Sequence, residues 1–134
     1  MRARVLSVFI VLGVGLFIVQ APASGAARGD GAPICAGLEA TIVGTGGDDV
    51  LFGTAGDDVI AGIDGNDTIY GLDGNDWLNG NHGNDTIYGG AGDDLIIPGK
   101  GQDTVDCGDG TDTVRTNFPA SGTYTDCEVF VDPA

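Results

Sequence analysis

The chain has 134 residues, of which 20 are acidic and five are basic, so its net charge is −15 at pH 7. Acidity of this size repels nucleic acid and anionic membrane surfaces, which excludes both as partners, and it favours a cationic partner. The 25 glycines would also suit a disordered acidic chain, but their regular spacing argues against disorder.

The N-terminal segment is typical of an export signal. Arg2 and Arg4 precede an apolar run over residues 5–19, and Ala21 and Ala23 form a small-x-small cleavage pattern. The run is shorter than the ~20 residues that a membrane-spanning helix needs. We therefore expect a signal peptide over residues 1–23, with cleavage as late as residue 27, and a secreted, extracellular product that has no membrane contact after signal removal. A retained signal anchor is the alternative.

Without that segment the chain keeps all 20 acidic residues but only three basic ones, a net charge of −17. Residues 24–34 are predicted to form a flexible leader. Residues 35–43 are predicted to form an N-terminal cap, because Thr41, Ile42 and Val43 read as the end of a repeat unit.

Residues 44–115 divide into eight nine-residue units without an insertion. The units are GTGGDDVLF, GTAGDDVIA, GIDGNDTIY, GLDGNDWLN, GNHGNDTIY, GGAGDDLII, PGKGQDTVD and CGDGTDTVR. The fourth place is always glycine, the sixth is always aspartate and the eighth is always aliphatic. The sixth-place aspartates are Asp49, Asp58, Asp67, Asp76, Asp85, Asp94, Asp103 and Asp112.

Each constant place has a physical reason. Glycine permits a sharp turn with positive φ, and the seventh to ninth places favour short strands. Alternation along a strand directs the eighth side chain inward and its two neighbours outward. Helix is disfavoured because glycine recurs too often. The units therefore predict an all-β fold with a thin aliphatic core.

Such a thin core does not offset the cost of ordering all eight units, and stacked aspartates add repulsion. Bound cations remove both problems, because their binding energy becomes folding energy. Carboxylate and carbonyl oxygens favour calcium, whereas zinc would require cysteine or histidine. The one histidine, His82, is expected to be an exposed loop residue. An EF-hand is excluded because both glutamates, Glu39 and Glu128, lie outside the repeats.

These units resemble the RTX nonapeptide repeat, G-G-x-G-x-D-x-U-x with U aliphatic. The resemblance implies a parallel β-roll, a β-helix solenoid of about four coils with two units in each coil. It also implies that calcium lies between turns stacked two units apart, held by sixth-place aspartates and loop carbonyls. The implied pairs give at most six bridged sites: Asp49 with Asp67, Asp58 with Asp76, Asp67 with Asp85, Asp76 with Asp94, Asp85 with Asp103, and Asp94 with Asp112.

Two third-place aspartates, Asp64 and Asp73, are further candidate calcium ligands, with solvated loop carboxylates as the alternative. Units seven and eight depart from the pattern because they begin with Pro98 and Cys107, so weaker sites are expected there. The resemblance implies calcium binding, and the N-terminal export signal sets this chain apart from RTX toxins, which leave by a C-terminal signal.

Three cysteines leave at least one without a partner in the chain. Cys35 and Cys107 occupy first places four coils apart, about 19 Å at the spacing of neighbouring strands, too far for a disulfide. We therefore expect Cys107 to pair with Cys127 and to tie a C-terminal cap, residues 116–134, to the last coil. Cys35 is then free or joins a second chain by self-association.

The outward places are predicted to stack in ladders. One ladder contains Phe52, Tyr70, Tyr88 and Asp106, and beside it lie Val50, Thr68, Thr86 and Thr104. Ladders of this kind stabilise neighbouring strands. They also leave open an extracellular protein, glycan or ice partner as the alternative to a structural or adhesive calcium-binding role. No catalytic set is found, so an enzyme is not expected, although an accessory module of a secreted hydrolase is a third alternative.

Overall fold

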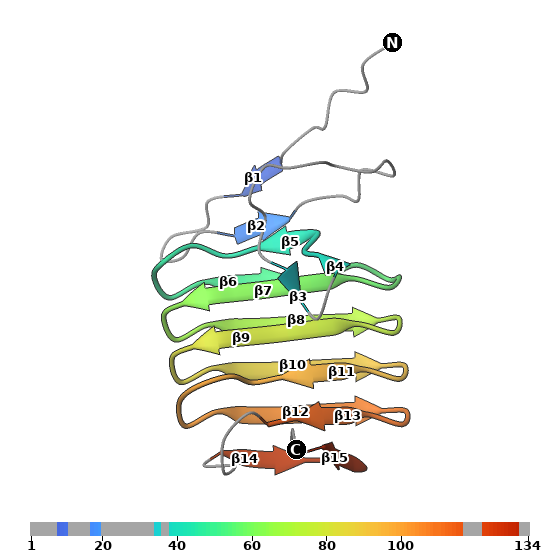
Figure 1. The fold of residues 1–134 in the computed structure, drawn as a ribbon. Helices are drawn as coiled ribbons and strands as arrows, with labels where there is room; N and C mark the ends of the chain where they lie inside the picture. The colour runs from blue at the N-terminus through green and yellow to red at the C-terminus, as the bar shows by residue number, and fades with distance from the viewer. Residues whose placement is uncertain (1–7, 11–16, 20–33, 36–37, 117–121, 132–134) are drawn as a thin grey trace.

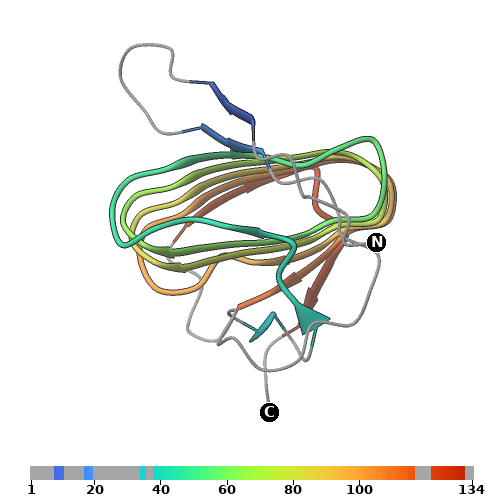
Figure 2. The same cartoon turned by 90° about the horizontal axis from the view of Figure 1, so that it is seen from above.

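The computed structural model describes residues 8–10, 17–19, 34–35, 38–116 and 122–131. All regular elements within these residues are β-strands, and the chain winds through them in flattened coils that stack along one axis (Figure 1). Seen along that axis, successive coils lie over one another (Figure 2). In the described part of the chain, no helix is long and apolar enough to cross a membrane.

Apart from the antiparallel pair of β1 and β2, the strands of the roll form two parallel sheets that face each other across the core. The strands of the first sheet lie in the order β1-β2-β6-β8-β10-β12-β14, and those of the second in the order β15-β13-β11-β9-β7-β5. The first sheet contains β1 (Val8–Ile10), β2 (Phe17–Val19), β6 (Val50–Phe52), β8 (Thr68–Asp73), β10 (Thr86–Ala91), β12 (Thr104–Asp109) and β14 (Thr123–Thr125). The second contains β5 (Ile42–Val43), β7 (Val59–Asp64), β9 (Trp77–His82), β11 (Leu95–Ile97), β13 (Thr113–Arg115) and β15 (Val129–Val131).

Neighbouring strands within the repeats keep a constant register of two repeat units. Leu51 aligns with Ile69, and Ile69 aligns with Ile87. Two nine-residue units therefore complete one coil, and the chain forms a β-solenoid of about four turns. The all-β parallel roll expected from the sequence is confirmed.

The core is a single column of aliphatic side chains. All eight eighth-place residues are at most 1% exposed, which confirms that these places face inward: Leu51, Ile60, Ile69, Leu78, Ile87, Ile96, Val105 and Val114. The strands are longer than the sequence predicts, because five of them continue from the seventh place into the third place of the next unit. Backbone pairing between coils therefore extends into what was expected to be turn.

Strands cover both ends of the roll. Ile42 of β5 pairs with Ile60 at one end, while β14 and β15 add a partial coil beyond β12 and β13 at the other. β3 (Ile34–Cys35) and β4 (Leu38–Glu39) form a short antiparallel pair, and β3 contacts β7 and β9. Ala61 of β7, expected on an outward place, is fully buried.

The predicted signal segment is described only at two short strands. β1 pairs with β2, and β2 lies parallel to β6 with Phe17 beside Val50. The signal peptide, its cleavage position and the domain limits stay predictions. The expected leader lies outside the described residues except for Ile34.

Candidate metal centre

The sixth-place aspartates form two buried columns, one along each turn of the roll. Each aspartate immediately precedes a strand, so the two-unit register places it directly above its counterpart in the next coil. All eight are at most 4% exposed: Asp49, Asp58, Asp67, Asp76, Asp85, Asp94, Asp103 and Asp112. Eight buried carboxyl groups in so small a fold require compensating partners.

One oxygen of each carboxyl group from the second coil onward has a partner. The Oδ1 atom of Asp67 accepts a hydrogen bond from the backbone N–H of Asp49 at 2.9 Å. The same bond joins every stacked pair expected from the sequence, at 2.8–3.0 Å. The structure thus brings these pairs together and links consecutive coils through them.

The other oxygen has no partner in five of these groups. The buried Oδ2 atoms of Asp67, Asp76, Asp85, Asp94 and Asp112 make no hydrogen bond. A buried acceptor without a partner costs free energy, and the cost is larger when the group is charged. A column of such atoms along the turns indicates that a ligand absent from the polypeptide completes them.

A backbone carbonyl shares the space around four of the five free oxygens, those of Asp67, Asp76, Asp85 and Asp94. A Cβ placed on Gly71 would overlap the carbonyl oxygen of Gly89 and lie 2.5 Å from the Oδ2 atom of Asp76. The same arrangement recurs at Gly80 and Gly89, where the carbonyls belong to Pro98 and Cys107. First-place glycine therefore leaves open a small cradle in which a carboxylate and a carbonyl oxygen converge.

Burial makes these carboxyl groups hold their protons unusually firmly. Loss of hydration raises the pKa of Asp67, Asp76 and Asp85 from 3.8 to about 6, although each accepts a backbone hydrogen bond that opposes the change. The pKa of Asp94 rises to about 7, and repulsion from Asp76 and Asp112 adds to the effect of burial. Burial also raises the pKa of Asp103 and Asp112.

The donor set fits a hard cation. Across the described residues, no three histidine, cysteine, aspartate or glutamate side chains converge on one point, so a site built from three or more such side chains is not formed. Two carboxylates from stacked turns, completed by loop carbonyls, match the oxygen ligands and the flexible geometry of calcium. A bound calcium ion would supply positive charge between carboxylates that otherwise repel one another.

Asp64 and Asp73 lie apart from the buried columns. Both side chains are exposed, and Oδ1 of Asp64 lies 2.8 Å from Nδ1 of His82 in the next coil. His82 is exposed as expected, but it is the last residue of β9 and not a loop residue, because pairing between coils extends into the third place. A role for the two aspartates as calcium ligands stays a prediction.

Glu128 continues the aspartate column although it lies outside the repeats. Its Oε2 atom accepts a hydrogen bond from the N–H of Asp112 at 2.9 Å. Asp112 accepts an equivalent hydrogen bond from the N–H of Asp94. The sequence carries a signal for this role, because Glu128 precedes the β15 residues as Asp112 precedes β13. The step to Glu128 is two residues shorter than the steps within the repeats, which hides it from a search with a constant period.

The fifth place carries a second hydrogen-bonded ladder that was not expected. Oδ1 of Asp48 accepts the N–H of Asn66, and Oδ1 of Asn66 accepts the N–H of Asn84. On the other turn, Asp57 accepts from Asn75 in the same way. These exposed bonds run from the later coil to the earlier one, opposite to the bonds of the sixth place, so neighbouring coils are joined in both directions.

The predicted disulfide between Cys107 and Cys127 is present, with Cα atoms 5.2 Å apart. Cys107 is fully buried against the aliphatic core, and Cys127 packs against the same core. The bond joins the C-terminal segment to β12. A free Cys35, or self-association through it, stays a prediction.

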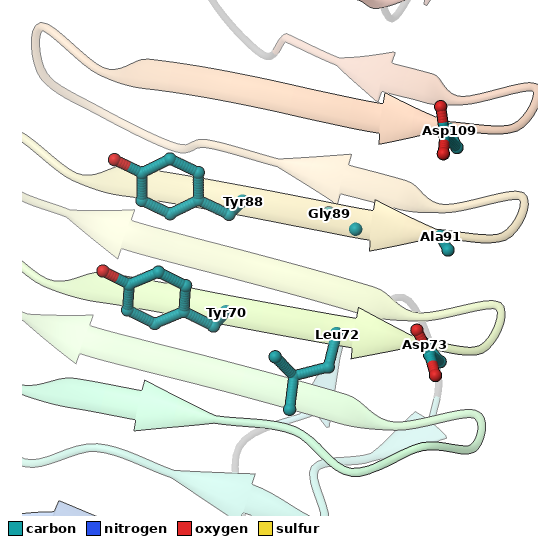
Figure 3. Close-up of a pocket in the computed structure, with 8 residues that line it drawn as sticks. Tyr70, Leu72, Asp73, Tyr88, Gly89, Ala91 and Asp109 are labelled. Carbon is teal, nitrogen blue, oxygen red and sulfur yellow. The ribbon is translucent and has the colours of Figure 1, made fainter.

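The outer face of the first sheet carries the expected aromatic ladder. The rings of Phe52, Tyr70 and Tyr88 are stacked, with centroids 4.8 and 4.9 Å apart. Beside Tyr88, a hollow of about 410 Å³ opens over β8 and β10, where Leu72 aligns with Gly90 in the next coil. Leu72 and the two tyrosines line one part of it, and Asp73 and Asp109 lie at its end (Figure 3).

Comparison with known proteins identifies the repeats. The family model for the RTX calcium-binding nonapeptide repeat matches four overlapping segments, residues 41–69, 61–96, 70–105 and 89–114. These segments contain every sixth-place aspartate and together cover more than half of the chain. No curated protein and no solved structure matches the chain.

Proposed function

Because the chain belongs to the RTX calcium-binding nonapeptide-repeat family, we propose that it is an extracellular structural or adhesive module that folds into its roll on binding calcium. The observation that carries the proposal is the series of buried Oδ2 atoms without a partner in Asp67, Asp76, Asp85, Asp94 and Asp112. They lie at successive turns, between which the resemblance to the family implies that calcium binds.

Electrostatics gives calcium its role in folding. At neutral pH the metal-free roll must either protonate its buried aspartates or hold them charged and close together. Both cost free energy, as the raised pKa of Asp94 shows. A divalent ion between two turns removes that cost, and each occupied site orders the backbone that forms the next one. Folding and binding are then a single cooperative process.

The extracellular setting is supported by two features of the chain. The Cys107–Cys127 disulfide is stable in an oxidising compartment, and the N-terminal residues have the composition of an export signal. External calcium at millimolar concentration suits sites of moderate affinity. We propose no catalytic role.

The test is a calcium titration of a chain that begins at residue 24, followed by far-UV circular dichroism. We expect a cooperative change from disorder to β-structure that chelator reverses and magnesium does not reproduce. Asp76→Asn should reduce the number of calcium ions bound per chain at saturation. Asp106→Asn removes the same charge from a partly exposed outer place and should leave that number unchanged. A roll that is equally folded in chelator and in calcium would refute the proposal.

Recognition of a glycan or protein on the outer face is a second candidate function, and the hollow beside Tyr88 favours it. Tyr88 and Leu72 are the large apolar side chains that stay exposed among the described residues, at 38% and 45%, and aromatic residues are common in recognition surfaces. A Tyr88→Ala, Leu72→Ser double variant should lose binding to an immobilised glycan or matrix-protein panel while its calcium midpoint is unchanged. A panel that the wild-type chain does not bind would remove this candidate.

A further inference from the structure

The first two turns of the roll differ in backbone conformation from the six that follow. The fourth-place glycines of units three to eight have positive φ, between 119° and 146°. Gly47 and Gly56, their counterparts in units one and two, do not. The second-place residues divide in the same way. Those of units three to eight have positive φ, whereas Thr45 and Thr54, the second-place residues of units one and two, do not.

The same two turns satisfy the carboxylate oxygen that five of the six later turns leave free. Oδ2 of Asp49 accepts hydrogen bonds from the backbone N–H of Thr45 at 2.5 Å and from its hydroxyl at 2.8 Å. Oδ2 of Asp58 accepts the equivalent bonds from Thr54 at 2.6 and 2.9 Å. Neither atom is among the buried oxygens without a partner.

The threonine hydroxyl explains the difference better than side-chain shape does. Ile63 is β-branched like threonine, yet it occupies the second place of unit three with a φ of 94°. Branching therefore does not prevent the turn used by the later units. A hydroxyl close to the backbone can bond a carboxylate locally and hold an alternative turn, and only units one and two carry a hydroxyl in this place.

We propose that Thr45 and Thr54 close the first two turns to calcium, so that the first coil folds without metal and provides the end on which the calcium-dependent coils assemble. The proposal rests on the calcium-driven folding proposed above. Hydrogen-bond donors of the polypeptide take the position that an ion takes in the later turns. Of the six stacked pairs, the two that contain Asp49 or Asp58 are then incomplete, and about four sites remain.

The first test counts bound calcium by equilibrium dialysis and elemental analysis at saturating calcium. We expect about four ions for the wild-type chain and about six for the Thr45→Gly, Thr54→Gly double variant, one more for each opened turn. The Thr45→Ser, Thr54→Ser variant keeps both hydroxyls and should match the wild type. An equal count in the glycine and wild-type chains would overturn the proposal.

A second pair of variants tests the same assignment if the glycine variant folds poorly. Asp49→Asn with Asp58→Asn should leave the ion count unchanged, because neither carboxylate holds an ion. Asp76→Asn with Asp94→Asn removes the same charge from turns with free oxygens and should lower the count. Equal losses in the two double variants would overturn the proposal.

Hydrogen exchange of the metal-free chain tests whether the first coil is an independent end. The amides of Thr41 and Gly44 donate to the carbonyls of Val59 and Ala61 at 2.7 and 2.8 Å, all within the cap and the first coil. The amides of Thr104 and Thr113 donate to the carbonyls of Asp85 and Asp94 in later coils at 2.8 Å. In chelator we expect exchange at least about tenfold slower for the first two amides, and equal rates would overturn this part.

These outcomes are distinguishable from failure of the proposed function. A wild-type chain that binds no calcium refutes the function itself. A wild-type chain that folds with calcium but has equivalent turns refutes only the role of the two threonines.

Discussion

Substitution of Asp76 by asparagine should stabilise the metal-free roll and reduce the stabilisation that calcium adds, so that the two changes nearly cancel in calcium. Asp76 is fully buried, its Oδ1 atom accepts the N–H of Asp58 at 2.8 Å, and its Oδ2 atom has no partner. Asparagine keeps the shape and the Oδ1 acceptor. It replaces the free oxygen by an NH2 group beside the carbonyl of Gly89, which can accept from it.

The expected changes in the free energy of unfolding follow from the pKa of the Asp76 carboxyl group and from the calcium ion that it would hold. Burial raises the pKa of Asp76 from 3.8 to about 6, so keeping it charged at pH 7 costs about 3 kcal/mol. We expect Asp76→Asn to stabilise the metal-free roll by up to about 3 kcal/mol. In calcium at about a hundred times the dissociation constant, the variant should lose the roughly 2.7 kcal/mol that one site contributes.

Urea unfolding followed by Trp77 fluorescence measures both effects. The titrations are run in chelator and in calcium, with the same concentration of an osmolyte such as TMAO present so that the metal-free chain begins folded. Asp106→Asn is the control and should change the free energy of unfolding by less than about 0.5 kcal/mol in either condition. Destabilisation by Asp76→Asn in chelator, or an unchanged response to calcium, would refute the reasoning.

The same geometry supports three further predictions. Between about pH 4 and pH 7 the folded metal-free roll keeps protons, on Asp94 above all, that the unfolded chain has released. Its stability should therefore fall as pH rises through this window while calcium affinity rises, and chemical unfolding in chelator at several pH values checks the sign. Gly71→Ala places a methyl group against Asp76 and should weaken calcium binding by at least about tenfold, an overpacking cost of about 1–3 kcal/mol, whereas Gly46→Ala, where a Cβ meets nothing within 4 Å, should stay within about twofold in calorimetry. Cys127→Ser should lower the free energy of unfolding by about 3 kcal/mol, because it releases a loop of about 20 residues in the unfolded state, and the reducing agent that destabilises the wild type should leave this variant unchanged.

The repeat made the core and the aspartate columns predictable from sequence. Strict recurrence of an aliphatic eighth place and of an acidic sixth place defines both, and the constant period of nine indicates which residues stack. The disulfide was also predictable, because the period was expected to separate Cys35 from Cys107, although Cys35 lies in β3, outside the two stacked sheets. The structure confirms the inward eighth places, the two-unit register and the Cys107–Cys127 bond.

The features that were missed are those in which the period or the residue type varies. The fifth place of units one to six holds either aspartate or asparagine, and their shared property is an acceptor oxygen at the same distance from the backbone. Glu128 lies short of the period, so only the structure shows it below Asp112. Thr45 and Thr54 look like simple departures from glycine until their hydrogen bonds to Asp49 and Asp58 are seen.

The constant register has a consequence for how such a chain changes length during evolution. Each inner coil meets its neighbours through the same backbone bonds, so duplication of any two consecutive units within residues 62–97 would create a coil whose two surfaces already fit those around it. Deletion of two consecutive units would bring together surfaces that are equally well matched. The interior of the gene can therefore expand or contract in steps of one whole coil. The first coil with its two threonines and the last coil with its disulfide would each still occur once.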